Sequence, residues 1–199
     1  MSSAPWTASD EGFLRAHEWA GALARGSALP TEAAPVQLGP GEAAHARFAV
    51  TVSGLFGEDK PYRRGFLLVG GPVGLAVTGA ASLARNAAKK AEAERAAVPS
   101  WHRLGNADVT VTNQRLLASG NGETGSFWYA EMSPMQIAPG AGGAPAVEFQ
   151  SKSQPVLRLE SPWSPLLYVF VHHLVDGRPP SLPLPAGLLE RSRAQGRLR

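Results

Sequence analysis

Short runs in which apolar and polar residues alternate dominate the middle of the chain. In Ala44–Leu55, the apolar side chains fall on every second position, which is the pattern of a half-buried strand. Further short runs follow, separated by Gly, Asn and Pro, and predict strands at Trp101–Leu104, Ala107–Thr112, Leu116–Leu117, Phe127–Tyr129, Pro134–Pro139, Ala146–Ser151 and Val156–Glu160. Strands that recur about every 8–12 residues indicate a small antiparallel sandwich or barrel.

Apolar residues at helical spacing stand on both sides of this region. Thr7–Arg25 is predicted to be a helix, because Thr7 and Asp10 form a capping-box pattern and Gly26 stands where a helix would end. We expect this helix to pack on the main domain; the alternative is an arm that docks on a partner or a membrane. Its polar face carries more acidic than basic residues, which disfavours an anionic bilayer.

A second helix is predicted at Ser164–Val175, near the end of the chain. Pro165 suits its first turn, Gly177 suits its C-terminal end, and its apolar residues form a broad stripe. The Pro- and Arg-rich remainder, Arg178–Arg199, is predicted to lack regular structure.

The segment Gly65–Ala84 allows two interpretations. It is uncharged and reaches the roughly 20 residues that a membrane span needs. A single span, however, would place the strands before and after it on opposite sides of the bilayer, where they could not share a sheet. We therefore expect a buried strand near Phe66–Val69, a Gly/Pro turn, and then a helix that runs to about Ala97 and stops before Pro99.

These patterns predict an α+β chain with three parts. Residues 1–39 hold the N-terminal helix and a Pro/Ala-rich linker, residues 40–177 form the main domain with residues 65–99 as an insertion, and residues 178–199 are the tail. A length of 199 residues fits one domain with such appendages.

Composition narrows the classes of function. The chain has no cysteine, which excludes disulfides, thiolate chemistry and thiolate zinc sites. Its net charge of +3 is small for this length, and no segment interleaves basic with aromatic residues, so we expect no nucleic-acid partner. No signal-peptide pattern precedes the first helix, so a cytoplasmic location is expected, with peripheral contact to the inner membrane face as an option.

No catalytic or cofactor motif stands out along the chain. The G-x-G-x-x-G pattern at Gly120–Gly125 precedes a predicted strand rather than the helix that a dinucleotide site needs, so it is interpreted as a hairpin loop. His172 and His173 are neighbours on a predicted helix and diverge, which does not suit a metal pair. We therefore expect a protein that is not an enzyme and that holds no cofactor or metal.

Three segments resemble the bacterial pleckstrin-homology-like and GRAM-like domains. They are Pro40–Glu42 before the first strand, the hairpin Ala107–Leu117 with its Thr-Asn-Gln-Arg-Leu-Leu core, and the helix Ser164–Val175. The resemblance covers about Pro40–Gly177. It implies a small antiparallel barrel or sandwich capped by a C-terminal helix, and a non-enzymatic binding module.

Thr112, Asn113 and Arg115 form the predicted turn motif of that hairpin. Asn113 can adopt a positive φ in a tight turn or hydrogen-bond its own backbone, and the β-branched Thr112 suits the end of a strand. Arg115 can clamp backbone carbonyls or a carboxylate such as Asp108. We favour this structural role over phosphate binding.

The predicted function is binding to a protein partner or to an anionic membrane surface. The predicted interaction surface consists of basic residues that flank the apolar insertion: Lys60, Arg63, Arg64, Arg85, Lys89 and Lys90. Two alternatives stay open. One is a soluble, self-associating scaffold in which the apolar stretch is buried, and the other is a barrel that binds a small ligand.

Overall fold

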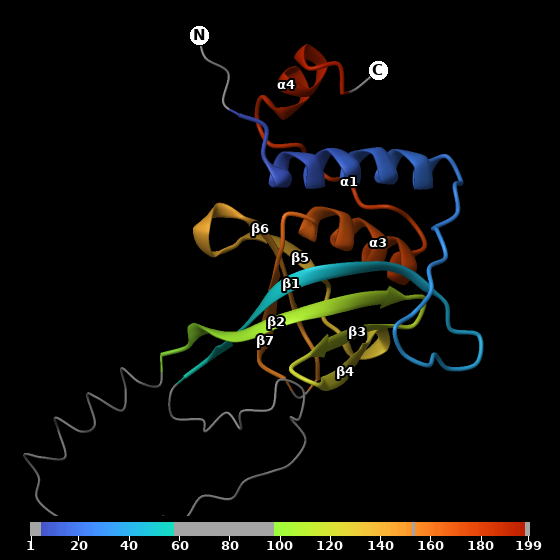
Figure 1. Cartoon of the computed structure of the whole chain (residues 1–199), viewed down its shortest axis with the longest axis vertical. Helices are drawn as coiled ribbons and strands as arrows, with labels where there is room; N and C mark the ends of the chain where they lie inside the picture. Colours follow the sequence, from blue (N-terminus) through green and yellow to red (C-terminus); the bar gives the residue numbers. More distant parts are fainter. Residues whose placement is uncertain (1–4, 58–97, 153, 198–199) are drawn as a thin grey trace, which may run out of the picture.

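The computed structural model describes residues 5–57, 98–152 and 154–197, and these residues form one sheet and three helices (Figure 1). The helices are α1 (Ala8–Ala24), α3 (Ser164–Asp176) and α4 (Leu188–Ala194). The strands are β1 (Ala44–Phe56), β2 (Ser100–Thr112), β3 (Arg115–Gly120), β4 (Glu123–Trp128), β5 (Gln136–Pro139), β6 (Pro145–Gln150) and β7 (Val156–Glu160). Short 3-10 turns at Tyr129–Glu131 and Ala141–Gly143 stand on either side of β5.

The seven strands of the described residues form an antiparallel sheet in the order β4-β3-β2-β1-β7-β6-β5. β1 is the central strand, since it pairs with β2 along its whole length and with β7 through Thr51–Leu55. The α+β class and the antiparallel arrangement are confirmed at this level.

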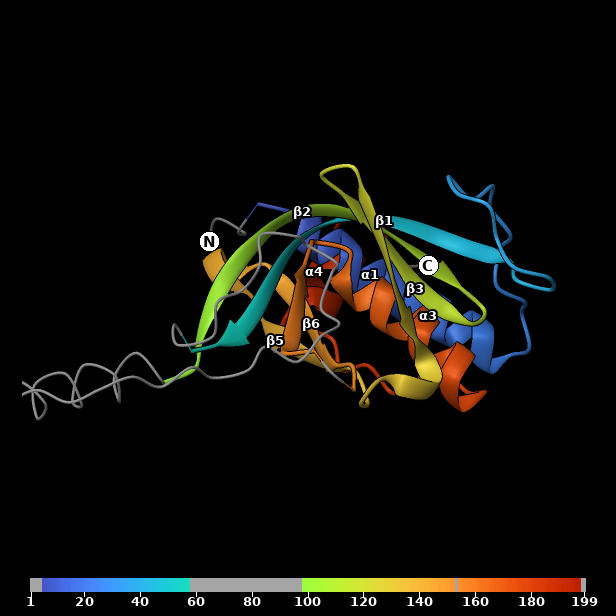
Figure 2. The same cartoon turned by 90° about the horizontal axis from the view of Figure 1, so that it is seen from below.

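β2 is one strand where the sequence predicts two. The expected separation of Trp101–Leu104 from Ala107–Thr112 is wrong, because a β-bulge joins them. The register against β1 shifts just after Val52, where Leu104 is the extra residue, and the adjacent Gly105 has a φ of 148°. A bulge bends a strand pair without ending it, and Figure 2 shows β1 and β2 curving together.

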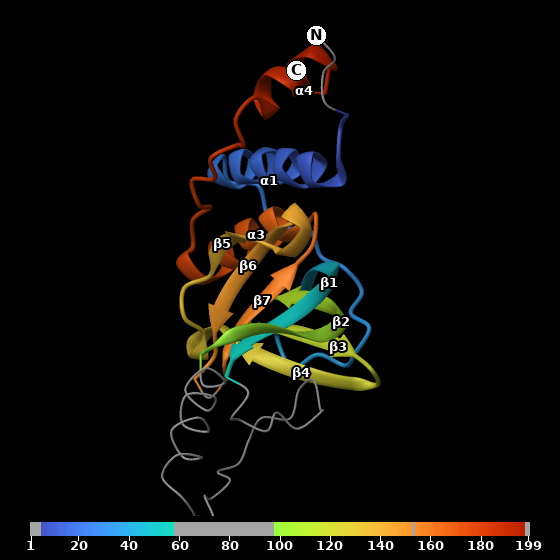
Figure 3. The same cartoon turned by 90° about the vertical axis from the view of Figure 1, so that its left-hand side faces the viewer.

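The helices cover one face of the sheet in successive layers (Figure 1, Figure 3). α3 contacts β2, β5 and β6, and α1 packs on the side of α3 that faces away from the sheet. Phe170 of α3 joins the layers, because its ring meets Trp19 of α1 at 5.3 Å and Phe48 of β1 at 6.5 Å between centroids, both edge to face. α3 is therefore apolar on both sides, with Leu167, Phe170 and Val171 buried.

α1 begins with the capping box that the sequence predicts. The Thr7 hydroxyl accepts a hydrogen bond from the backbone N–H of Asp10 (3.1 Å), and the Asp10 carboxylate accepts one from the N–H of Thr7 (3.0 Å). Gly12 then allows α1 to approach the segment before α3, since a Cβ atom there would lie 1.8 Å from the carbonyl oxygen of Pro162. The expected packing of this helix on the main domain is confirmed.

The prediction that the C-terminal tail lacks structure is wrong for Leu188–Ala194, which forms α4. Leu188 and Ser192 are fully buried, and Arg191 forms an ion pair with Asp10 in the first turn of α1. The partners of this helix lie at the opposite end of the chain. A local pattern therefore could not reveal it.

The predicted elements of the insertion lie outside the described residues. This applies to the strand near Phe66–Val69 and to the whole of the predicted helix that ends at about Ala97. Across the ranges that the structure describes, no helix combines the length and the hydropathy needed to cross a bilayer.

Replacement of Gly12 tests how α1 is docked. We expect Gly12→Ala to lower the free energy of unfolding by about 3 kcal/mol, because the backbone of α1 or of Pro162 must move to admit the methyl group. Urea denaturation of the purified protein measures the change.

Gly21→Ala is the matched control on the same helix. A Cβ atom at Gly21 meets only a guanidinium nitrogen of Arg25, at 3.3 Å, and Ala is a better helix former than Gly by about 1 kcal/mol. Gly21→Ala should therefore be neutral or stabilising. Equal losses in the two variants would contradict the close approach at Gly12.

Candidate functional site

The turn between β2 and β3 is organised by Thr112. Its hydroxyl oxygen accepts hydrogen bonds from the backbone N–H groups of Gln114 (3.1 Å) and Arg115 (3.0 Å). The same hydroxyl donates to the carboxylate of Glu42 (2.8 Å), in the segment before β1. The phenol of Tyr129 donates to the carbonyl of Thr112 (2.8 Å), and burial raises the pKa of that phenol.

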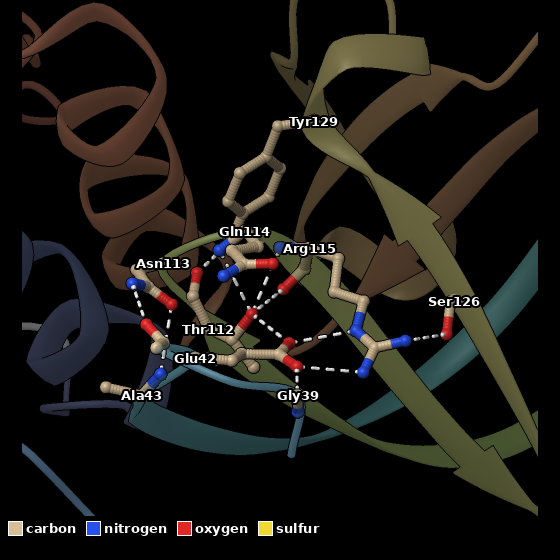
Figure 4. Close-up of polar contacts among 10 residues, drawn as sticks. Gly39, Glu42, Ala43, Thr112, Asn113, Gln114, Arg115, Ser126 and Tyr129 are labelled. Carbon is tan, nitrogen blue, oxygen red and sulfur yellow. Dashed lines mark hydrogen bonds and ion pairs between the residues drawn. The ribbon is translucent and has the colours of Figure 1, made fainter.

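Arg115 and Glu42 form a bidentate ion pair at this turn (Figure 4). Nε donates to Oε1 and Nη2 to Oε2, both at 2.8 Å, and the Glu42 side chain has no exposed surface. The second carboxylate oxygen also accepts the N–H of Gly39 (2.9 Å). The Arg115 hydrogen bonds, offset in part by burial, lower the pKa of Glu42 to about 2, and the same pairing raises the pKa of Arg115.

The remaining contacts of Arg115 lie on β4. Nη1 donates to the hydroxyl of Ser126 (3.0 Å), and the guanidinium lies 4.5 Å from the ring centroid of Trp128. The carboxylate partner is thus Glu42 and not Asp108, which pairs instead with Arg47. Arg115 does clamp a carboxylate, but that carboxylate belongs to a residue 73 positions away in the sequence. The residues around the turn therefore could not identify Glu42 as its partner.

Asn113 fastens the turn to the segment that precedes β1. Its side-chain amide donates to the carbonyl of Gly41 (3.0 Å) and accepts the N–H of Ala43 (3.0 Å), as Figure 4 shows. Both alternatives expected for Asn113 are wrong, because its φ is not positive and its side chain bonds the backbone of Gly41 and Ala43 rather than its own. Among the described non-glycine residues, positive φ occurs at Asn121 (φ 52°), in the hairpin between β3 and β4.

Glu42, Thr112, Asn113 and Arg115 together tie three segments of the chain to one another. The carboxylate and the guanidinium satisfy each other inside the protein, so the arrangement serves the structure and offers no open anion site. The G-x-G-x-x-G segment Gly120–Gly125 lies in the β3–β4 hairpin and precedes no helix, as predicted. The loop itself is shorter than predicted, because Gly120 ends β3 and Glu123 begins β4.

The predicted basic interaction surface lies outside the described residues. It consists of Lys60, Arg63, Arg64, Arg85, Lys89 and Lys90. Within the described ranges, no group of three or more His, Asp or Glu side chains is arranged to hold a metal ion.

A groove of about 590 Å³ lies elsewhere, between the start of α1, the β5–β6 hairpin and the C-terminal segment that leads into α4. Its apolar lining includes Phe13 of α1, Ile137 and Pro139 of β5, Pro145 of β6 and Pro185 before α4. The sequence did not indicate this groove, because its walls come from three segments that lie far apart along the chain.

The polar wall of the groove is the ion pair between Asp10 and Arg191. One carboxylate oxygen of Asp10 caps α1 through Thr7, and the other accepts Arg191 Nη2 at 2.5 Å. Both oxygens of Asp10 are therefore engaged within the protein. The groove offers a ligand mainly apolar contact, beside one neutralised charge pair.

Comparison of the chain with protein-family models, with curated proteins and with solved structures finds no match. What this chain does is therefore inferred from the geometry of its own residues.

The Glu42–Arg115 pair makes stability depend on pH in a defined window. The pKa of Glu42 is lowered from its usual 4.5 to about 2, so the pair stabilises the fold above pH 4.5, and this contribution is lost as the pH falls from 4.5 towards 2. Glu42→Gln should cost about 3 kcal/mol at neutral pH, because it leaves Arg115 without its counter-charge. The difference between the two proteins should shrink below pH 4.5 in urea denaturation.

Glu18→Gln provides the surface control. Glu18 pairs with Arg15 on α1, where both side chains are substantially exposed, and such pairs contribute at most about 1 kcal/mol. The free energy of unfolding of Glu42→Gln should approach that of the unmodified protein as the pH falls from 4.5 towards 2. A difference between them that stayed constant over this range would contradict the assigned role of Glu42.

Proposed function

We propose that this chain is a non-enzymatic, pleckstrin-homology-like binding module, and that it binds an extended apolar segment of a protein partner. The groove between α1, the β5–β6 hairpin and the C-terminal segment is the observation that carries the proposal. It is a concave apolar surface with one charge pair on its wall, the combination by which proteins hold and orient ligands.

The architecture supports the family assignment. Antiparallel strands are followed directly by a single helix, α3, that lies against the sheet, which is the layout that the resemblance implies. The turn motif Thr112, Asn113 and Arg115 stands between two neighbouring strands and binds the segment that contains Gly41 and Glu42. Two of the segments on which the resemblance rests are therefore in direct contact.

The shape and lining of the groove favour a peptide over a small molecule. Small ligands are usually enclosed over most of their surface, whereas this groove is largely open to solvent. Pro139, Pro145 and Pro185 line it, and a proline ring restricts its own backbone before any ligand binds, so binding would cost little conformational entropy there.

The charges of the described surface favour a protein over an anionic membrane. Several arginines are already paired with carboxylates: Arg15, Arg47, Arg115, Arg158, Arg191 and Arg197. An anionic membrane attracts unpaired basic residues close to its surface. Pairing within the protein removes most of that attraction for these side chains.

Selection from a random peptide library tests the proposal. Peptides retained by the unmodified protein should be rich in apolar residues, and Pro185→Asp should weaken their binding at least about tenfold, roughly 1.4 kcal/mol. The substitution puts a charge on the apolar wall at an exposed position. Fluorescence polarisation with the labelled peptides measures the affinities.

Pro183→Asp is the matched control, because Pro183 is also exposed and lies two residues away without lining the groove. Pro139→Asp, on the opposite wall, should reproduce the loss caused by Pro185→Asp. If the selected peptides bound Pro185→Asp and Pro139→Asp as tightly as they bind the control Pro183→Asp and the unmodified protein, the groove would be excluded as the peptide-binding site. Failure to select peptides, together with salt-sensitive co-sedimentation with anionic but not neutral vesicles, would replace the protein partner by a membrane.

A further inference from the structure

The sheet ends in two very different edge strands. β5 is four residues long, ends at Pro139 and is preceded by Pro134. Short edge strands that contain or adjoin proline resist pairing with strands of other chains. β4 is six residues long, with the sequence Glu-Thr-Gly-Ser-Phe-Trp. It contains no proline, lysine or arginine, and its single charge stands at its first residue, Glu123. β4 therefore lacks the usual devices that keep an edge strand unpaired.

The register of the hairpin shows which backbone groups face the open edge. The N–H of Tyr129 donates to the carbonyl of Gln114 on the β3 side (3.2 Å), so the odd-numbered residues of β4 face β3. Thr124, Ser126 and Trp128 alternate with them and direct their N–H groups outwards. Within the described residues, no strand lies beyond β4.

The side chains along this edge suit pairing with another strand. Thr124, Ser126 and Trp128 are all exposed, and Trp128 is 41% exposed, which is high for so large a hydrophobic residue. Phe127 is buried and anchors the strand to the core. The indole of Trp128 is held by the Arg115 guanidinium, whose charge Glu42 neutralises, so Trp128 presents an ordered apolar surface.

We propose that β4 pairs antiparallel with β4 of a second copy of this chain, about a two-fold axis at Ser126. In that register Ser126 faces its own counterpart, and Thr124 faces Trp128 of the other copy. A β-branched residue opposite an aromatic residue is a favourable cross-strand pair. Glu123 faces an uncharged residue, Tyr129, so no like charges oppose each other.

The residue types at the edge favour a second copy as the occupant. With the axis at Ser126, the exposed Thr124 and Trp128 of one strand meet Trp128 and Thr124 of the other, so the favourable pair forms twice. A two-fold contact of this kind closes on itself and yields a dimer rather than a fibre. The two sheets become one continuous sheet through β4.

Disulfide trapping tests the register, because the chain has no cysteine of its own. Hydrogen-bonded antiparallel pairs have Cα atoms about 5.5 Å apart, within the range that a disulfide spans. Ser126→Cys should cross-link to itself under mild oxidation. A mixture of Thr124→Cys and Trp128→Cys should cross-link faster than either variant alone.

Ala49→Cys is the matched control, since Ala49 is exposed on β1 in the same sheet but away from the edge. It should yield no more cross-linked dimer than random collision gives. Circular dichroism of each variant checks that the fold is retained. Equal cross-linking of Ser126→Cys and Ala49→Cys would overturn the proposal.

Sedimentation of the unmodified protein over a wide concentration range should show a monomer–dimer equilibrium. Ser126→Pro removes an outward-facing N–H and should abolish the dimer, while Ser126→Thr keeps that N–H and should retain it. Ser126→Asp keeps the backbone N–H and sets two like charges opposite each other at the axis, so it should also abolish the dimer, which covers the case that the proline variant does not fold. A protein that stays monomeric at every concentration would overturn the proposal.

Peptide binding in the groove and dimer formation through β4 can be tested independently. β4 and β5 are at opposite edges of the sheet, and the groove lies beside β5. Pro185→Asp should therefore leave the dimer intact, and Ser126→Pro should leave the binding of selected peptides intact.

Discussion

Burial of both sides of α3 is the constraint on which the layers of this protein depend. The sheet needs a cover for Phe48 and its neighbours, and α3 supplies it with Phe170. A helix with apolar residues on two opposite sides cannot be an outer layer, so α1 must cover α3 in turn, through Trp19. Burial of one such aromatic side chain contributes roughly 2–3 kcal/mol. α4 then packs near the start of α1, where its Arg191 pairs with Asp10.

A second constraint fixes the opposite part of the sheet. The Glu42–Arg115 pair anchors the segment before β1 to the β2–β3 turn, and Arg115 reaches onward to Ser126 and Trp128 on β4. The carboxylate is fully buried, and a lone carboxylate there would be costly. The two charges are therefore interdependent. Their pairing orders the edge strand at the point where Trp128 is exposed.

The sequence predicts the local features of this fold and misses what distant residues make together. The capping box of α1, the helix at Ser164 and most strands follow from periodicity and end signals, which act over a few residues. The continuity of β2 through its bulge, the choice of Glu42 as the partner of Arg115, and α4 depend on contacts between remote segments. The groove escaped prediction for the same reason, and the basic surface proposed from sequence lies outside the described residues.

The position of the two proposed surfaces has a consequence for binding. The groove depends on Asp10, which caps α1 with one carboxylate oxygen and binds Arg191 of α4 with the other. The walls of the groove therefore form only when α1 and α4 are both packed in place. It lies at the β5 side of the sheet, whereas the dimer contact lies at the β4 side. Pairing through β4 would leave both grooves free, one at each end of a continuous sheet. Such a dimer could hold two segments of one partner at once, and the second binding event would then be intramolecular and favoured by a high effective concentration. Two modest affinities, one from each groove, would in this way combine into stable binding.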